Sequence, residues 1–297
     1  MALSIRQPAV AGQFYPSDKD ELYELIHRSF TNSIGPGKFP SGSQKPQEIS
    51  RVECVIVPHA GYIYSGPVAA HSYKIAFDFF QKFKDEDRLV VFILGPNHYG
   101  IGSGVALSGV KRWHTPLGDI SVATDFVKKL ASDSRIVDID DIAHSREHSI
   151  EVQIPFLQAM AGNMGDKVSV VPICLMLQDL ETAGEVGDEV LSQIKQSNLP
   201  SLVIGSSDLT HYESHEKASL KDHAVLDEVT RLQILSFYNV LERRNVTACG
   251  YGAIAAVMNI SKKLGKREGT LLKYATSGET SGDKSSVVGY SAVHFLP

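Results

Sequence analysis

Residues 54–66 have the sequence CVIVPHAGYIYSG, in which a short apolar run ends at a proline and a histidine, His59. The same arrangement returns at residues 88–100, RLVVFILGPNHYG, where the apolar run is followed by Gly-Pro-Asn and then by His98. A short apolar run bounded by turn-forming residues is typical of a buried strand. Each stretch therefore predicts a strand whose carboxyl end carries a histidine.

A third stretch, SLVIGSSDLTHY at residues 201–212, predicts another strand, followed by Asp208 and His211. In open α/β sheets, ligands bind beyond the carboxyl ends of the strands, because side chains there emerge from a rigid scaffold into a crevice walled by loops. A lone histidine at a strand end is more often a surface residue than a ligand, but the repetition favours a shared site. We therefore expect His59, His98, Asp208 and His211 to line one crevice.

Strands and helices alternate along the rest of the chain. Apolar runs predict strands at 52–57, 89–94, 104–108, 168–176, 201–205, 270–275 and 286–295. Helical spacing predicts helices near 67–82, 124–131, 149–161, 179–196, 218–237 and 252–264. The alternation predicts an α/β fold whose central mixed sheet is covered by helices on both faces.

The first fifty residues predict one more helix and a loop. Ser17 precedes three acidic residues, and apolar residues recur at helical spacing from Leu22 to Phe30, which predicts a capped amphipathic helix. Residues 31–50 are rich in Gly, Pro and Ser, and we expect a surface loop there. Because no linker follows, we expect a single domain over residues 1–297.

Charge and cysteine usage limit the partners and the compartment. The net charge is −5 and no block of like charges occurs, so we expect neither a nucleic-acid partner nor a membrane partner. The chain has three cysteines, an odd number, and has neither a secretory signal nor an apolar run long enough to cross a bilayer. These features favour a cytoplasmic protein.

The segment EHSIEVQIPF, residues 147–156, adds a fourth group of polar side chains. If it begins a helix, Glu147 and Glu151 share one face and His148 is turned away by about 100°. The positive end of that helix would favour the neutral form of His148, which suits a ligand or a hydrogen-bond partner of a negative group.

Two imidazoles at one sheet edge suggest a metal site. Neutral imidazoles suit iron, copper and zinc, and His59 and His98 would supply them. The residues leave the third ligand open between Glu147, Asp208 and Cys249, of which the cysteine would favour copper or zinc. His211, three residues after Asp208, is the candidate general base, held by the neighbouring acid. The other histidines are better explained as solvated or packed residues: His27, His71, His114, His144, His215, His223 and His294.

Cys249 differs in its setting from the other two cysteines. It lies in TACGYG, a glycine-flanked turn before a predicted helix, whereas Cys54 and Cys174 lie in apolar strands. A thiol beside a helix N-terminus has a lowered pKa, so we expect Cys249 to ionise readily.

At these residues the sequence resembles the Memo proteins. The matching motifs span nearly the whole chain: AGQFYP (11–16), PHAGYIYSG (58–66), LGPNHYG (94–100), EHSIEVQIPF (147–156), SSDLTHY (206–212), CGYG (249–252) and VVGYSAV (287–293). Memo proteins look like the LigB-type extradiol dioxygenases, which open catechol rings with Fe(II) held by two histidines and a glutamate. The resemblance implies that His59 and His98 stand in place of those metal ligands and His211 in place of the acid/base histidine, while Cys249 replaces the glutamate.

The resemblance also implies ligands and partners. Tyr62 and Asn97, inside the matching motifs, are expected to bind substrate together with His148 and Glu147, and Asp208 is expected to assist His211 in catalysis. The animal Memo protein is described as binding phosphotyrosine peptides in this pocket and copper or iron through the two histidines and the cysteine. Microbial members are often encoded beside a radical-SAM protein and an AMMECR-type protein, which implies a shared pathway.

Three functions follow from these expectations. The first is a cytoplasmic metal-binding protein whose pocket derives from a dioxygenase and performs redox or oxygen chemistry on a small substrate. The second is a non-enzymatic pocket for a phosphorylated or carboxylate-bearing peptide. The third is metal-assisted hydrolysis, because a His/His/Cys metal with an open position can activate water. Whether the protein is an enzyme is left open at this stage.

Overall fold

The computed structural model describes residues 4–42 and 49–296, which build a mixed sheet around five parallel strands. In order across the sheet, these strands are β6 (Gly118–Val122), β8 (Val168–Leu175), β3 (Leu89–Pro96), β9 (Ser201–Ser206) and β2 (Val52–Val57). Because β3, β9 and β2 are parallel neighbours, their carboxyl ends lie side by side.

Antiparallel strands extend the sheet on both sides. Beyond β2 lies β12 (Val287–Leu296). Both β11 (Glu268–Thr276) and β10 (His211–Glu213) pair with β12. Beyond β6 lie β5 (Arg112–Thr115) and β1 (Ile5–Arg6), while β4 (Val105–Leu107) pairs with β8 and β7 (Val137–Ile139).

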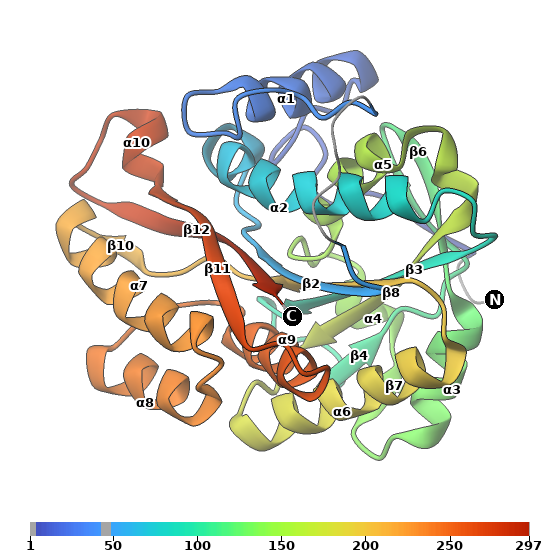
Figure 1. The fold of residues 1–297 in the computed structure, drawn as a ribbon. Coiled ribbons are helices and arrows are strands. Elements are labelled where there is room, and N and C mark those ends of the chain that lie inside the picture. The colour runs from blue at the N-terminus through green and yellow to red at the C-terminus, as the bar shows by residue number, and fades with distance from the viewer. Residues whose placement is uncertain (1–3, 43–48, 297) are drawn as a thin grey trace.

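Helices cover both faces of this sheet (Figure 1). One layer contains α1 (Lys19–Thr31), α2 (Tyr62–Lys82) and α5 (Ile154–Ala161), and the other contains α3 (Thr124–Asp133), α6 (Leu180–Ser197) and α9 (Tyr251–Lys263). The remaining helical segments are α4 (Asp141–His144), η1 (Glu151–Gln153), η2 (Gly162–Lys167), α7 (His215–Thr230), α8 (Ile234–Arg244) and α10 (Ser277–Ser281). The α/β fold with a mixed, doubly covered sheet is thus confirmed.

The central strands are buried along their whole length, as expected for parallel strands covered on both faces. Every residue of β3, β8 and β9 is buried, and one hydrophobic cluster extends from Val10 to Phe295. This continuous core supports the single domain, which stays our prediction.

Several elements differ from the expected ones. The predicted helix 218–237 is divided into α7 and α8, because Leu232 adopts a left-handed backbone (φ 55°) while its side chain stays buried. The hairpin of β5 and β6 was not expected, since its strands are short and rich in polar residues. Helix α1 is capped by Asp18 rather than Ser17, because the Asp18 carboxylate accepts the N–H groups of Asp20 and Glu21.

The segment 31–50 is less detached from the core than its composition indicates. Phe39 packs on three rings of α1, those of Tyr23, His27 and Phe30, at 5.0–6.1 Å between ring centroids. The expected surface loop also includes residues 43–48, which lie outside the described residues.

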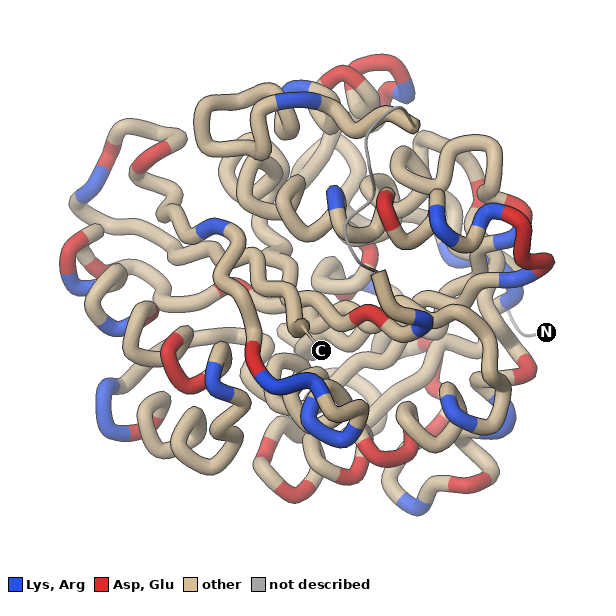
Figure 2. Tube along the Cα trace, viewed as in Figure 1, with Lys and Arg blue, Asp and Glu red and all other residues tan. Residues whose placement is uncertain are grey.

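Charged side chains lie mainly on the outer helices and loops. Figure 2 shows acidic and basic residues interspersed there, with no stripe of one sign on the face in view. Within the described ranges, none of the helices is both long enough and apolar enough to cross a membrane.

Candidate metal centre

The carboxyl ends of β2, β3 and β9 open into a cavity of about 680 Å³. His59 follows β2, His98 follows β3 and Asp208 follows β9, so the parallel pairing of these strands brings the three side chains together. His211, His148 and Cys249 line the same cavity. Further lining residues are Phe14, Tyr64, Tyr212, Ser277, Ser281, Asp283, Ser286, Val288 and Tyr290.

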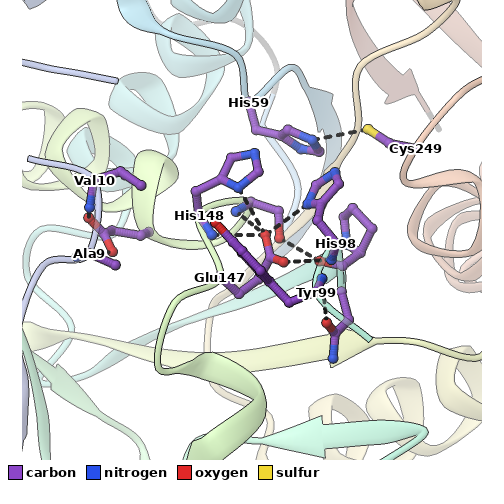
Figure 3. A network of polar contacts seen from close by, with 12 residues as sticks. Ala9, Val10, His59, His98, Tyr99, Glu147, His148 and Cys249 are labelled. Atoms are coloured by element: carbon purple, nitrogen blue, oxygen red, sulfur yellow. Dashed lines mark hydrogen bonds and ion pairs between the residues drawn. The ribbon is translucent and has the colours of Figure 1, made fainter. Parts of the chain in front are cut away.

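His59, His98 and Cys249 converge on one point of this cavity (Figure 3). The Sγ atom of Cys249 lies 3.0 Å from Nε2 of His59, and one donor atom from each of the three residues lies within 4.8 Å of the others. The imidazole rings of His59 and His98 meet edge to face, with 5.2 Å between their centroids.

Hydrogen bonds around Ser206 determine which nitrogen of His59 faces the cavity. The Ser206 hydroxyl lies 2.7 Å from the carbonyl oxygen of Ser149, to which it can only donate its single proton. It therefore accepts from Nδ1 of His59, 2.9 Å away, and from Nε2 of Gln153 at 2.8 Å. Nδ1 of His59 carries the proton, so Nε2 presents a lone pair toward Cys249.

The protonation state of His59 fits the same role. Burial, followed by the neighbouring imidazoles of His148 and His98, lowers the pKa of His59 well below its usual value. The ring is therefore neutral, as a metal-binding imidazole must be.

Glu147 orients His98 in a similar way. Its carboxylate lies 2.9 Å from Nδ1 of His98 and also accepts the backbone N–H groups of His98, His148 and Ser149 at 2.6–2.8 Å. Although burial opposes ionisation, the bond from His98, the neighbouring imidazoles of His98 and His148 and the amide of Ser149 lower the pKa of Glu147 to about 2. The carboxylate thus holds Nδ1–H of His98 and leaves its Nε2 free for a metal, as in the carboxylate–histidine–metal arrangement of many metalloproteins.

The segment 147–150 is a turn and not the start of a helix, in contrast to the expectation. The 3-10 turn η1 begins at Glu151 and α5 at Ile154. Consequently Glu147 and Glu151 diverge: Glu151 forms a buried ion pair with Arg6 at 2.6 Å and accepts the N–H groups of Ala9 and Val10. These contacts hold the N-terminal segment, with Ala9 and Val10, in place beside the site (Figure 3).

The turn directs His148 into the cavity. Its ring stacks on His98, with 4.5 Å between centroids and 21° between planes, and contacts Phe14 at 4.5 Å. Burial lowers the pKa of His148 to about 4, although Glu147 opposes this shift, so the ring is neutral as expected. The expected cause, a helix N-terminus, is wrong. Together with His98 and Glu147, His148 forms a second group of closely spaced donor atoms.

His211 and Asp208 lie in the cavity but are not paired through a hydrogen bond. Nδ1 of His211 lies 3.0 Å from the carbonyl oxygen of Thr247 and must donate to it, which leaves Nε2 as a proton acceptor. Asp208 instead accepts the backbone N–H of His59 at 2.8 Å. Burial raises the pKa of Asp208 to about 6, although the bond from His59 and the nearby His211 oppose the rise. The orienting group of His211 is therefore a backbone carbonyl.

Cys249 lies just before α9, as predicted, but its thiol is not acidified by that position. Burial, and then the charge of Asp208, raise the pKa of Cys249 above its usual range. The expected effect of the helix N-terminus is thus outweighed by desolvation. A bound cation would reverse the shift, because a coordinating thiol is deprotonated. Two inward imidazole lone pairs beside one thiol therefore fit a metal ion.

Tyr62 and Asn97, which were expected to bind substrate, are not among the residues that line the cavity. The Tyr62 hydroxyl donates to the carbonyl oxygen of Val152, and its buried ring packs on Phe156. Tyr64, two residues further along α2, lines the cavity instead. The Asn97 side chain caps its own loop, accepting the N–H groups of Tyr99 and Gly100 and donating to Ile101.

Some functional contacts had no clear signal in the sequence. Ser206 and Gln153 fix the tautomer of His59, yet neither differs in type or spacing from ordinary core polar residues. Phe14 and Tyr212 also line the cavity, although neither residue was named as a site residue from the sequence.

Comparisons with known proteins agree along nearly the whole chain. A family model described as Memo-like protein matches residues 6–294. A MEMO1 family protein of Methanopyrus kandleri is 43% identical over 290 residues, 98% of each chain, and one of Sulfolobus acidocaldarius is 44% identical over 98% of this chain and 99% of its own. The crystal structure of an uncharacterized protein from Escherichia coli K12 covers 82% of this chain and 99% of its own, with a TM-score of 0.53 at 12% identity, a likeness of fold alone.

Proposed function

The chain belongs to the Memo-like family, and we propose that its cavity binds a metal ion through His59, His98 and Cys249 and performs redox or oxygen chemistry on a small organic substrate. The observation that carries the proposal is the convergence of two imidazole rings and one thiol at the carboxyl ends of parallel strands. Three protein ligands leave further coordination positions for a substrate.

The two imidazoles and the thiol limit which metal ions the site can bind. Imidazoles suit iron, copper and zinc, whereas a thiolate shifts the preference toward copper and zinc. When bound, iron or copper would supply a one-electron couple and a Lewis acid to the substrate. The chain itself positions the ligands, through Glu147 behind His98 and Ser206 behind His59.

The protein groups beside the ligands can handle protons and orient a substrate. Nε2 of His211 is free to accept a proton from a substrate hydroxyl, because Nδ1 is occupied by the carbonyl of Thr247. Asp208, whose pKa is raised to about 6 by burial, is placed to take up or release a proton near neutral pH. Tyr64 and Tyr212 add aromatic side chains to the cavity lining.

The composition of the cavity argues against an anionic peptide as its main ligand. Among the described residues that line it, none is a lysine or arginine, while Asp208 and Asp283 contribute carboxylates. His59 and His148 are neutral and would add no positive charge to compensate a phosphate dianion. The peptide-binding alternative is therefore the less favoured one.

The metal that the site binds distinguishes the remaining alternatives. Bound zinc, which has no redox chemistry, would favour metal-assisted hydrolysis over redox or oxygen chemistry.

Metal analysis tests this proposal. The protein is purified without oxygen and assayed for bound metal, then loaded separately with Fe(II), Cu(I), Cu(II) and Zn(II). We expect stoichiometric binding that is lost in His59→Ala. Binding of a phosphotyrosine peptide to metal-free protein, without stoichiometric uptake of any of these ions, would favour the non-enzymatic alternative. The radical-SAM and AMMECR-type proteins implied by the resemblance are the partners we propose to test next.

A further inference from the structure

The loop between β8 and α6 carries a residue that contacts the turn of Cys249 from outside the cavity and that the strand-end pattern does not predict. The half-buried Gln178 lies in this loop. Its Nε2 donates to the carbonyl oxygen of Cys249 at 2.9 Å, and its Oε1 accepts the N–H of Gly252 at 2.9 Å. One side-chain amide thus connects the two ends of the turn 249–252, which carries the thiol.

Close packing and a further hydrogen bond fix Gln178 in this place. A Cβ atom at Gly252 would lie 2.8 Å from Cβ and 2.9 Å from Cα of Gln178, so only glycine permits the approach. Tyr238 of α8 donates its hydroxyl to the carbonyl oxygen of Gln178 at 2.7 Å. The loop therefore has little freedom to move away from the turn.

The opposite side of the turn packs against the end of β9. The N–H of Gly250 donates to the Ser207 hydroxyl at 2.9 Å, and a Cβ atom at Gly250 would lie 2.2 Å from the carbonyl oxygen of Ser206. The Asp208 N–H lies 3.3 Å from Sγ of Cys249. The turn is thus held between β9 and Gln178.

We propose that Gln178 is a positioning residue that holds the Cys249 sulfur at the metal centre from outside the cavity. It does not line the cavity, so it acts through the turn and not on a ligand. The inference rests on the proposed metal site, and its physical basis is that a metal ligand needs support from residues behind it to keep its geometry. Without the Gln178 amide, the turn 249–252 loses its hydrogen bonds at the Cys249 carbonyl and the Gly252 N–H, and Cys249 can shift away from His59.

Gln178→Met keeps the length of the side chain and removes both hydrogen bonds, and Gln158→Met is its matched control. Gln158 is also half-buried and connects two groups, accepting from the Thr115 hydroxyl and donating to the Gly118 carbonyl, on α5 outside the cavity lining. Cobalt(II) is the probe, measured by chelator competition and by the thiolate-to-cobalt absorption band. We expect Gln178→Met to lower cobalt affinity about tenfold or more and to weaken the band, and Gln158→Met to change neither.

A second readout does not depend on the metal. The rate of Cys249 alkylation by iodoacetamide is measured in metal-free protein, where Cys54 and Cys174 are buried and silent. We expect faster alkylation in Gln178→Met than in wild type or Gln158→Met, because the turn is released. If wild-type protein binds no cobalt but this difference is present, the metal proposal fails while the positioning role holds.

Tyr238→Phe keeps the test decisive if Gln178→Met does not fold. It removes only the hydrogen bond that holds the Gln178 backbone, so we expect changes of about two- to tenfold in the same directions. The inference would be overturned if a folded Gln178→Met variant kept the wild-type cobalt affinity, absorption band and alkylation rate. If only Tyr238→Phe folds, the same unchanged values in that variant would overturn it.

Discussion

The sulfur of Cys249 lies 3.0 Å from Nε2 of His59, although 190 residues separate them along the chain. This contact joins the carboxyl end of β2 to the N-terminal end of α9, beside the parallel pair of β2 and β9. Because Nδ1 of His59 donates to Ser206, the lone pair of its other nitrogen is directed at the thiol. The arrangement has the donor types and the spacing of a metal site.

Glu147 is expected to be needed for metal affinity without being a ligand. Glu147→Gln removes the charge that holds Nδ1–H of His98 and should lower metal affinity by about 10–100-fold. Glu86→Gln, at a surface ion pair with Arg51, is the control and should leave affinity unchanged. Chelator competition measures both, and an unaltered affinity in Glu147→Gln would show that His98 needs no such support.

A buried ion pair far from the site should matter for stability. Lys266 pairs with Glu53 at 3.1 Å, and both side chains are almost fully buried. Lys266→Met removes the lysine charge and leaves the buried carboxylate only its hydrogen bonds from His294 and Ser50, so it should cost about 3–5 kcal/mol. Lys263 pairs with Asp188 on the surface, where both are half-exposed, and Lys263→Met should cost about 0–1 kcal/mol. Urea unfolding measures the loss of unfolding free energy in each variant. Similar losses in the two variants would contradict the expected difference between the buried and the exposed ion pair.

The same cluster predicts a pH dependence. Although burial opposes it, the hydrogen bond from His294 and the charge of Lys266 lower the pKa of Glu53. A carboxyl whose pKa is lower in the folded state stabilises the fold above its unfolded pKa of about 4.3, and this contribution is lost as the pH falls through the folded pKa. The difference in unfolding free energy between wild type and Glu53→Gln should therefore be largest at neutral pH and shrink below about pH 4. A difference that stays constant from pH 7 to pH 3 would contradict this.

Catechol and protocatechuate should not be cleaved at a useful rate. A thiolate ligand from Cys249 would change both the metal preference and the redox behaviour relative to an iron site completed by a carboxylate, as ring cleavage would require. Protein loaded anaerobically with Fe(II) is mixed with each substrate and oxygen, and absorbance is followed. Rapid formation of a yellow ring-opened product would refute this expectation.

Much of the site could be predicted because parallel strands align their ends. His59, His98 and Asp208 follow three strands that are neighbours in the sheet, so a pattern local in sequence corresponds to proximity in space. Cys249 approaches from the turn before α9, and only its glycine-flanked setting and the family resemblance distinguished it from Cys54 and Cys174.

Other features depend on contacts that sequence patterns do not contain. The segment from Glu147 forms a turn because its carboxylate binds its own backbone amides, which replaces the expected helical start. Tyr62 and Tyr64 lie two residues apart at the start of α2, and only packing decides which of them faces the core. Gln178 is an unremarkable polar residue in a loop until the fold places it against Cys249.

The most direct measurement of the central claim is metal affinity, by chelator competition in reducing buffer, for single substitutions of the three cysteines beside His59→Ala. We predict that Cys249→Ser and His59→Ala each lower metal affinity about tenfold or more. Even substitutions of residues that only support a metal ligand typically lower affinity by about 10–100-fold. Cys54→Ser and Cys174→Ser, whose thiols are buried in β2 and β8, should keep nearly wild-type affinity and lose only stability. Wild-type affinity in Cys249→Ser, with affinity lost in His59→Ala, would show that the thiol is not a ligand and that a carboxylate such as Asp208 or Glu147 takes its place.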